Sequence, residues 1–223
     1  KDGELHVGMG PNGSGKSTLA NVISGKENYN ITKGKIKYFN ENLLNMKIEE
    51  RASKGIFMSF QYPVEIPGIN NAYFLRSAIN SQQKFNNQKE INAPSFMKEY
   101  KHNMEKLDLD NSFISRCLNE GFSGGEKKRN EMLQMLMIKP KLCILDETDS
   151  GLDIDALKII SQSIQSMRNS KRSFIVITHY HRILEHLDAD FVHILSNGEI
   201  VKTGSKNLAL EIEKKGFKAV LSN

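Results

Sequence analysis

The sequence is poor in cysteine and has no long apolar run. Its two cysteines among 223 residues, Cys117 and Cys143, lie far apart and show no CxxC spacing. So few thiols exclude a disulfide framework and a cysteine-held metal cluster, which favours a reducing compartment. The longest apolar stretches, residues 142–145 and 174–177, fall far short of the roughly 20 residues that span a bilayer, so we expect no transmembrane helix. Cys143 lies inside one of these stretches and is expected to be buried as a small core residue.

Neither a targeting leader nor a stripe of one charge sign is visible. Residues 1–9 show no charged segment followed by a long apolar stretch, although a leader could have been removed. The 31 lysines and arginines outnumber the 26 acidic residues, for a net charge of +5, but the two signs are interspersed. This pattern predicts a solvated surface and no nucleic-acid-binding face. The 39% hydrophobic content is enough for one large domain or a domain with an inserted lobe.

A glycine-rich loop stands between a strand and a helix near the start of the sequence. Residues 5–9 form a short apolar strand candidate, and apolar residues at helical spacing follow the loop. The loop fits the pattern G-x-x-x-x-G-K-[ST], in which backbone N–H groups and a helix start bind phosphate oxygens. Lys16 would reach the β- and γ-phosphates, Ser17 would bind Mg²⁺ and Thr18 would reach the α-phosphate. A chance glycine-rich turn is the alternative, and the flanking strand and helix disfavour it. The predicted phosphate-binding residues are Gly10, Pro11, Asn12, Gly13, Ser14, Gly15, Lys16, Ser17 and Thr18.

Two acidic residues follow the apolar strand candidate at residues 142–145. In a sheet of mainly parallel strands, Asp146 and Glu147 would emerge at the carboxyl edge, where such folds bind their ligands. Asp146 would hold Mg²⁺ through water, and Glu147 would polarise the water that attacks the γ-phosphate. An isolated Asp-Glu pair is commonly a polar strand cap, but the phosphate loop disfavours that alternative here.

Strand and helix candidates alternate along the chain, which predicts an α/β fold with a mainly parallel sheet. An edge strand is expected at residues 35–39, further strands at 56–60 and 173–177, and helices at 48–54, 124–137 and 155–167. Residues 70–118 are polar, free of glycine and helix-like, which predicts an inserted helical lobe. Asn197 and Gly198 separate two short strand candidates, which predicts a hairpin, and a C-terminal helix follows it.

A second helix start suited to an anion follows the lobe, at Ser123, Gly124 and Gly125. Alone it would be an ordinary N-cap. Its position between the helical lobe and the Asp146 strand, however, resembles the ABC ATPase family, whose SGG signature binds the γ-phosphate of ATP held by the opposite subunit. The resemblance implies a P-loop nucleotide-binding domain with an inserted α-helical subdomain, ATP and Mg²⁺ as cofactors, and hydrolysis of ATP to ADP and phosphate.

The same resemblance implies roles for further residues. Gln61 would be the Q-loop residue that senses magnesium and water, residues 150–153 with Asp153 the D-loop across a dimer interface, and His179 the switch histidine on the γ-phosphate. The implied catalytic residues are Glu147, His179 and Gln61, and the implied metal residues are Ser17, Gln61 and Asp146. His179 and His181 could instead suggest a metal site, but no nearby cysteine or carboxylate completes a ligand set.

Longer segments are similar to the SufC-type branch of this family. They are residues 61–68 (QYPVEIPG), 122–129 (FSGGEKKR), 149–157 (DSGLDIDAL), 171–174 (KRSF) and 178–180 (THY), and the similarity spans essentially the whole chain, more weakly over 80–115 and after 205. It implies an ATPase that drives iron-sulfur cluster assembly on a scaffold of SufB and SufD through an ATP-dependent homodimer. Residues 62–71 and the helical lobe would be the docking surface for that scaffold.

The resemblance also implies a division of the chain. Residues 1–69 would be the RecA-like catalytic core, 70–122 the helical subdomain, and 123–223 the rest of the core with signature helix, Walker B strand, D-loop and H-loop. The family normally has further strands and an adenine-stacking aromatic residue before the phosphate loop, whereas nine residues precede Gly10 here, so we expect no adenine platform in this chain. Lys127 and Lys128, one turn into the signature helix, are predicted to pair with Glu147 when no partner is docked.

Two other functions share parts of this pattern. The ATPase subunit of an ABC membrane transporter would keep the catalytic residues but require a membrane-embedded partner. A non-enzymatic or DNA-associated ABC clamp would lack the catalytic glutamate or carry a long coiled-coil insertion, whereas Glu147 is present and the insertion is short. The frequent asparagine and lysine favour the stroma of a plastid-type, apicoplast-like organelle, with the bacterial cytoplasm as the alternative.

Overall fold

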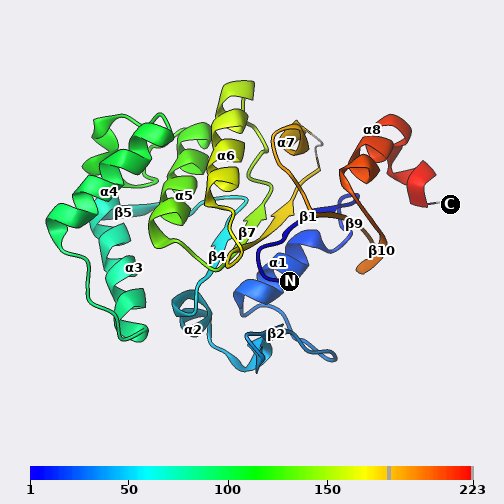
Figure 1. The fold of residues 1–223 in the computed structure, drawn as a ribbon, viewed down its shortest axis with the longest axis horizontal. Coiled ribbons are helices and arrows are strands. Elements are labelled where there is room, and N and C mark those ends of the chain that lie inside the picture. The colour runs from blue at the N-terminus through cyan, green and yellow to red at the C-terminus, as the bar shows by residue number, and fades with distance from the viewer. Residues whose placement is uncertain (180–181, 222–223) are drawn as a thin grey trace.

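A six-stranded sheet forms the centre of the molecule. The computed structural model describes residues 1–179 and 182–221. The strands are β1 (Leu5–Met9), β4 (Ile56–Ser59), β7 (Leu142–Asp146), β8 (Ser173–Ile177), β9 (Phe191–Ser196) and β10 (Glu199–Gly204). Their order in the sheet is β10-β9-β1-β8-β7-β4 (Figure 1). All neighbours pair in parallel except β9 and β10, so the predicted α/β fold with a mainly parallel sheet is confirmed.

Helices cover both faces of this sheet. They are α1 (Lys16–Ser24), α2 (Ile48–Ser53), α5 (Gly124–Ile138), α6 (Ile154–Met167), α7 (Arg182–Glu185) and α8 (Lys206–Leu221), the last with a break at Gly216. In Figure 1, α1 lies on one side of the sheet, and α5, α6 and α7 lie on the other. The central strands β7 and β8 are accordingly mostly apolar on both faces, as expected for a parallel sheet covered on both sides. Phe174 on β8 is fully buried on one face, and Ile144 on β7 is fully buried on the other.

The interior also holds Cys143, in the middle of β7. Its side chain is 0% exposed, and burial raises the pKa of the thiol to about 12. The prediction that Cys143 is a core residue is therefore confirmed.

Within the described residues, no helix combines the length and apolar character needed to cross a bilayer.

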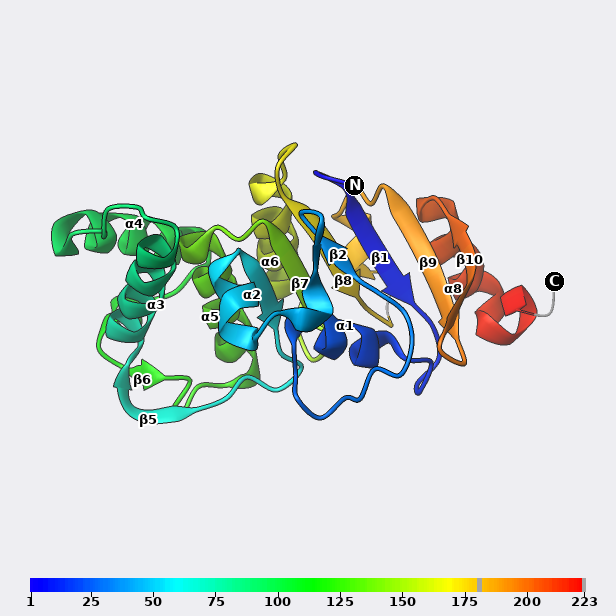
Figure 2. The same cartoon turned by 90° about the horizontal axis from the view of Figure 1, so that it is seen from below.

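The hairpin predicted around Asn197 and Gly198 is present as β9 and β10. Both turn residues have positive φ angles, 50° and 83°, as the tight turns that match strand twist require. This hairpin forms one edge of the central sheet and runs beside β1 (Figure 2). The Asn-Gly pair predicted this hairpin correctly because the conformation of a tight turn depends mainly on its own two central residues.

The inserted segment forms a lobe at the far end of the molecule from α8 (Figure 1). It contains α3 (Asn71–Phe85), α4 (Ala93–Lys106) and a short 3-10 helix (Asn111–Ile114). Asn70 and Asn92 cap α3 and α4, because their side chains accept hydrogen bonds from the first turn of each helix. Leu75, Phe96 and Tyr100 fill its core and are at most 2% exposed. A small sheet of β5 (Ile66–Asn70) and β6 (Cys117–Leu118) joins the two ends of the lobe.

Two expectations about strands were incomplete or wrong. The β5–β6 sheet was not predicted, because β5 contains Pro67 and Gly68, which disfavour a strand. The edge strand expected at residues 35–39 is absent from the central sheet. Instead β2 (Lys37–Tyr38) pairs with β3 (Glu41–Asn42) in a separate hairpin, which ends in a 3-10 turn at Leu43–Asn45. Phe39 and Asn40 adopt positive φ angles of 47° and 65°, so the chain turns back locally before it can reach a neighbouring strand.

Candidate functional site

The glycine-rich loop connects the end of β1 to the start of α1. Gly13 and Gly15 have φ angles of 78° and 100°, in the region that glycine adopts without strain, and Gly15 is the N-cap of α1. A Cβ atom at Gly10 would lie 2.2 Å from the carbonyl oxygen of Leu195 at the end of β9. The glycines therefore let the loop fold tightly against the carboxyl edge of the sheet.

This loop presents a row of backbone N–H groups to a cavity of 580 Å³. Among the described residues, the N–H groups of Gly13, Gly15 and residues 16–18 donate to no carbonyl oxygen. The first N–H groups of α1 add the positive end of its dipole. A concave set of unpaired N–H groups at a helix N-terminus fits phosphate oxygens, so the observed backbone fits a bound nucleoside phosphate.

Lys16 folds back into the loop that carries it. Its ammonium group donates to the carbonyl oxygens of Gly10 at 2.9 Å and Pro11 at 3.0 Å, and to Ser14 Oγ at 3.3 Å. The side chain is 5% exposed, and burial lowers the pKa of its ammonium group. A buried ammonium held by neutral oxygens is a strong donor for an anion that enters the cavity.

Ser17 and Asp146 bring two oxygen ligands together beside the phosphate loop. Ser17 Oγ at the start of α1 donates to Asp146 Oδ1 at the end of β7, over 3.1 Å. Burial raises the pKa of Asp146, while the Ser17 hydroxyl and the nearby Lys16 and Lys128 act in the opposite direction. A hydroxyl and a carboxylate next to a phosphate site are the oxygen donors that Mg²⁺ takes, so these residues fit that ion.

Glu147 lies between Gln61 and His179 at the rim of the same cavity. Gln61 Nε2 donates to Glu147 Oε2 over 2.7 Å, and His179 Nε2 is 2.8 Å from Glu147 Oε1. The three residues follow the carboxyl ends of β4, β7 and β8, which are neighbours in the sheet. Glu147 has a φ angle of 51°, an uncommon conformation for glutamate that its N–H bond to the Ile177 carbonyl helps to hold.

The cavity thus gathers most of the residues that the sequence nominated. Its lining consists of Asn12, Gly13, Ser14, Gly15, Lys16, Ser17, Thr18, Gln61, Glu147, Ser150 and His179. Gly10, Pro11 and Asp146 stand directly behind this lining, since Lys16 bonds to the first two and Ser17 to the third. Segments far apart in the sequence therefore converge on one phosphate-sized site.

Ser123, Gly124, Gly125 and Asp153 lie outside this cavity. Ser123 caps α5 in a reciprocal arrangement, since its Oγ accepts from the Glu126 N–H and its own N–H donates to Glu126 Oε2. Asp153 caps α6 by accepting from the Ala156 N–H over 2.7 Å. Ser123, Gly124 and Asp153 are exposed. Within one chain these residues therefore do not contact the phosphate loop.

The predicted pairing of Lys127 or Lys128 with Glu147 is wrong. Lys127 Nζ pairs with Glu65 over 2.6 Å, and Lys128 Nζ donates to the carbonyl oxygen of Phe60 over 2.8 Å. Both lysines of α5 reach the segment that follows β4, and within that segment Gln61 bonds to Glu147. The spacing of residues along a helix could not predict that these lysines would contact this segment and not Glu147.

Sequence reasoning also missed three polar residues that α5 buries. Lys128 is 6%, Asn130 is 0% and Glu131 is 4% exposed. In the sequence they stand in the polar run KKRNE, which looks like a solvated helix face. The apolar residues that follow this run on the same helix, Met132, Leu133, Met135 and Leu136, are the pattern that could have indicated a buried helix.

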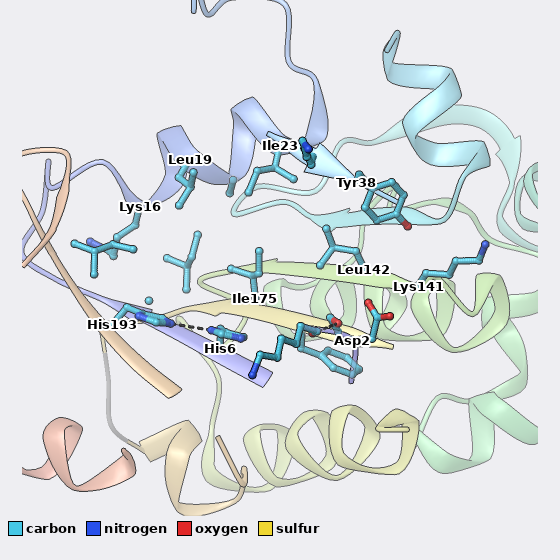
Figure 3. A pocket seen from close by; sticks show the side chains of 18 of the residues that line it. Asp2, His6, Lys16, Leu19, Ile23, Tyr38, Lys141, Leu142, Ile175 and His193 are labelled. Carbon is cyan, nitrogen blue, oxygen red and sulfur yellow. Dashed lines mark hydrogen bonds between the residues drawn. The ribbon is translucent and has the colours of Figure 1, made fainter. Parts of the chain in front are cut away.

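A larger cavity of 670 Å³ lies between α1 and the sheet (Figure 3). Leu19, Ile23 and Ile175 line it, and His6 and His193 meet there over a 2.8 Å hydrogen bond. Lys16 is shared with the phosphate cavity, but Gln61, Glu147 and His179 do not line this space. The smaller cavity is therefore the candidate site, because the convergent polar groups are there.

The alternative of a metal site at His179 and His181 stays untested, because His181 is not among the described residues. No group of three or more His, Cys, Asp or Glu side chains in the described part of the chain is arranged to hold a metal ion. His181 and Tyr180, the latter part of the SufC-like segment, lie outside the described residues.

The chain is similar to known proteins along nearly its whole length. Residues 1–150 match the family model described as ABC transporter. The chain is 52% identical to "Probable ATP-dependent transporter ycf16" of Trieres chinensis, over 96% of this chain and 86% of that protein. It is 47% identical to "Probable ATP-dependent transporter SufC" of Escherichia coli (strain K12), over 96% of this chain and 87% of that protein. It is 49% identical to "Vegetative protein 296" of Bacillus subtilis (strain 168), over 97% of this chain and 82% of that protein.

Solved structures share the fold. A dimeric ATP-binding cassette in a post-hydrolysis state with ADP and Pi aligns with a TM-score of 0.77 at 21% identity, over 92% of this chain and 87% of that one. A nucleotide-free cassette from an ABC transporter aligns with a TM-score of 0.73 at 25% identity, over 99% of this chain and 87% of that one. The family match and the relatives that are about half identical along nearly the whole chain show more than the fold. The chain belongs to the ABC transporter family of Mg²⁺-dependent, ATP-hydrolysing ATPases, among relatives named SufC and ycf16.

Proposed function

We propose that this ATPase drives iron-sulfur cluster assembly on a scaffold of SufB and SufD, through ATP-dependent dimerisation. The observation that carries the ATPase chemistry is the position of Glu147 between Gln61 and His179, at the rim of the phosphate cavity. The SufC-like assignment is supported by 47% identity to the E. coli protein over 96% of the chain.

In this proposal the loop from Gly10 to Thr18 binds the phosphates of ATP. Its unpaired N–H groups receive phosphate oxygens, and Lys16 exchanges its carbonyl acceptors for the β- and γ-phosphates. Ser17, Asp146 and Gln61 would hold a magnesium ion, which would supply positive charge beside the phosphates. The chain thereby fixes the γ-phosphate against the edge of the sheet that carries Glu147.

Glu147 then orients the water that attacks the γ-phosphorus. The bond to the bridging oxygen breaks, and that oxygen leaves with ADP, so the protein mainly supplies position and charge. In the present arrangement Gln61 and His179 engage the two carboxylate oxygens of Glu147. Each of these oxygens can accept a further hydrogen bond, so a water in the site would share the carboxylate with Gln61 and His179. His179 would move onto the γ-phosphate when ATP binds.

A second copy of the chain completes the site in this proposal. Ser123, Gly124, Gly125 and Asp153 would contact the ATP bound by the opposite subunit, because they are remote from the cavity of their own chain. The exposed start of α5 offers N–H groups and a helix dipole for that purpose. A solved cassette that shares the fold is dimeric with ADP and Pi bound, which supports a dimer for this chain.

The scaffold would dock on the segment from Tyr62 to Asn71 and on the neighbouring lobe. Tyr62, Val64 and Tyr73 are 82%, 66% and 69% exposed, a high value for large apolar side chains. We divide the chain accordingly into a core at residues 1–69, a docking lobe at 70–122 and the remaining core at 123–223. Since Gln61 directly precedes the exposed segment, a docked partner would act on the residue that touches Glu147.

We assign the protein to the stroma of a plastid-type, apicoplast-like organelle, with the bacterial cytoplasm as the alternative. Relatives named ycf16 in algae and the frequent asparagine and lysine support the first. The E. coli and B. subtilis relatives support the second. Imaging of the tagged full-length gene product would decide between them.

A second candidate function is the ATPase subunit of a membrane transporter, which the names of several relatives favour. Co-purification of the full-length protein with SufB and SufD from the same source separates the two proposals. ATPase rates with and without the scaffold proteins are measured alongside Glu147→Gln, which we expect to lower turnover about 100-fold or more. Glu49→Gln on the exposed face of α2 is the matched control. No binding to SufB or SufD, with turnover intact, would favour the transporter.

A further inference from the structure

Helix α5 carries an acid and a base in the protein interior, three residues apart. Glu131 and Lys128 are 4% and 6% exposed. Removing a carboxylate and an ammonium from water costs several kcal/mol for each unless hydrogen bonds replace the lost hydration. The two groups do not obtain these bonds mainly from each other, because Lys128 Nζ and Glu131 Oε2 are 3.8 Å apart.

Both side chains bond instead to the chain at the end of β4. Glu131 Oε1 accepts from the Phe60 N–H over 2.8 Å, and Oε2 accepts from Ser59 Oγ over 3.3 Å. Lys128 Nζ donates to the carbonyl oxygens of Phe60 over 2.8 Å and Gln61 over 3.2 Å. One turn of α5 thus holds an N–H group and two carbonyl oxygens within two successive residues.

The second of these residues is Gln61. Its side chain is exposed, and its amide reaches Glu147 over 2.7 Å. Because an exposed side chain makes few packing contacts, the position of the Gln61 amide relative to Glu147 depends mainly on the position of the Gln61 backbone. A displacement of about 1 Å in a group that orients a reactant can lower turnover 100-fold.

We propose that Glu131 and Lys128 are positioning residues that set Gln61 against Glu147 and thereby tune turnover. This inference rests on the proposed function, in which Gln61 and Glu147 act on ATP and its attacking water. The pair also ties α5, the helix that begins at Gly124, to Gln61, because Lys128 on this helix donates to the Gln61 carbonyl oxygen. The pair bonds to the backbone of residues 60 and 61, so its hydrogen bonds fix the chain that carries the Gln61 side chain.

The test is a steady-state ATPase measurement on the full chain with Glu131→Leu, Glu131→Gln, Asn103→Leu and Glu147→Gln. We expect Glu131→Leu to lower kcat by about 10- to 100-fold with an unchanged KM for ATP, because the phosphate loop is not touched. Glu131→Gln keeps an oxygen that accepts from the Phe60 N–H, so it should hold kcat within about twofold of wild type. Asn103→Leu is the matched control, since Asn103 is a buried polar residue that contacts α5 at Met137, away from Gln61.

The outcomes are distinct. Wild-type kcat in Glu131→Leu, with Glu147→Gln inactive, would overturn this inference and leave the proposed function standing. Equal losses of kcat in Glu131→Leu and Asn103→Leu would also overturn it, because the effect would then be one of stability. Normal turnover in Glu147→Gln would overturn the proposed function and this inference with it. If Glu131→Leu does not fold, Lys128→Met is judged by the same loss of kcat at constant KM.

Discussion

The substitution Glu131→Gln should make the protein more stable than wild type, and this difference should grow as the pH rises. The change keeps the shape of the buried side chain and its acceptor for the Phe60 N–H, but it removes the ability to ionise. Burial raises the pKa of Glu131 to about 7, from an ordinary value of 4.5, while Lys128 and the hydrogen bonds of Phe60 and Ser59 act in the opposite direction. Ionisation is thus less favourable in the folded protein than in the unfolded chain.

The sign and size of the effect follow from this shift. Between pH 4.5 and 7 the folded state binds more protons than the unfolded state, so stability is fully present below this window and is lost as the pH rises through 7. One pKa unit corresponds to about 1.4 kcal/mol, so the wild type should lose about 2 to 3 kcal/mol relative to Glu131→Gln between pH 5 and 8. Burial also raises the pKa of Asp146 and Asp149, and their contributions cancel in the difference between the two proteins.

Urea unfolding at pH 5, 6, 7 and 8, followed by far-ultraviolet circular dichroism, measures this difference. The two proteins should have similar midpoints at pH 5, and Glu131→Gln should have the higher midpoint at pH 8. Glu126→Gln is a control of opposite sign. The hydrogen bond of the Ser123 N–H, and then Arg116, hold the pKa of Glu126 below its usual range, so that variant should be less stable than wild type above pH 4.5. A stability difference between wild type and Glu131→Gln that does not change with pH would refute the reasoning.

Three further predictions concern other parts of the structure. Gly10→Ala forces a Cβ atom to 2.2 Å from the Leu195 carbonyl oxygen and should weaken ATP binding at least about tenfold by calorimetry, whereas Gly8→Ala meets only ordinary contacts. Equal binding by both variants would contradict this. Asn130→Leu removes the amide that donates to the side-chain oxygens of Asn71 and Asn119. It should lower the free energy of unfolding in urea by about 2 to 4 kcal/mol. A loss below about 1 kcal/mol would argue against a stabilising role for these hydrogen bonds. Cys143 should react with a thiol reagent only after unfolding, as mass spectrometry would show, and labelling of the native protein would count against its burial.

The outline of the fold was accessible from local patterns. Strand, phosphate loop and helix follow one another between residues 5 and 24, and a turn such as Asn197-Gly198 needs only its own two residues. The helical lobe was recognised from its composition, but the β5–β6 sheet at its base was not, because its strands pair over some fifty residues of intervening chain. The segment at residues 35–39 was misassigned for a related reason. The residue pattern of a strand does not predict whether that strand pairs with the central sheet or with the residues that directly follow it.

The sequence by itself determined the residues of the phosphate loop, the acidic pair after a buried strand and the alternation that makes the sheet parallel, because spacing and residue type carry that information. Only the tertiary structure decided that Gln61 and His179 meet at Glu147, and that Lys128 reaches backbone oxygens beside Gln61. It also decided that Glu131 is buried. These outcomes depend on which elements cover which helix face, and that is set by packing between residues distant in the chain.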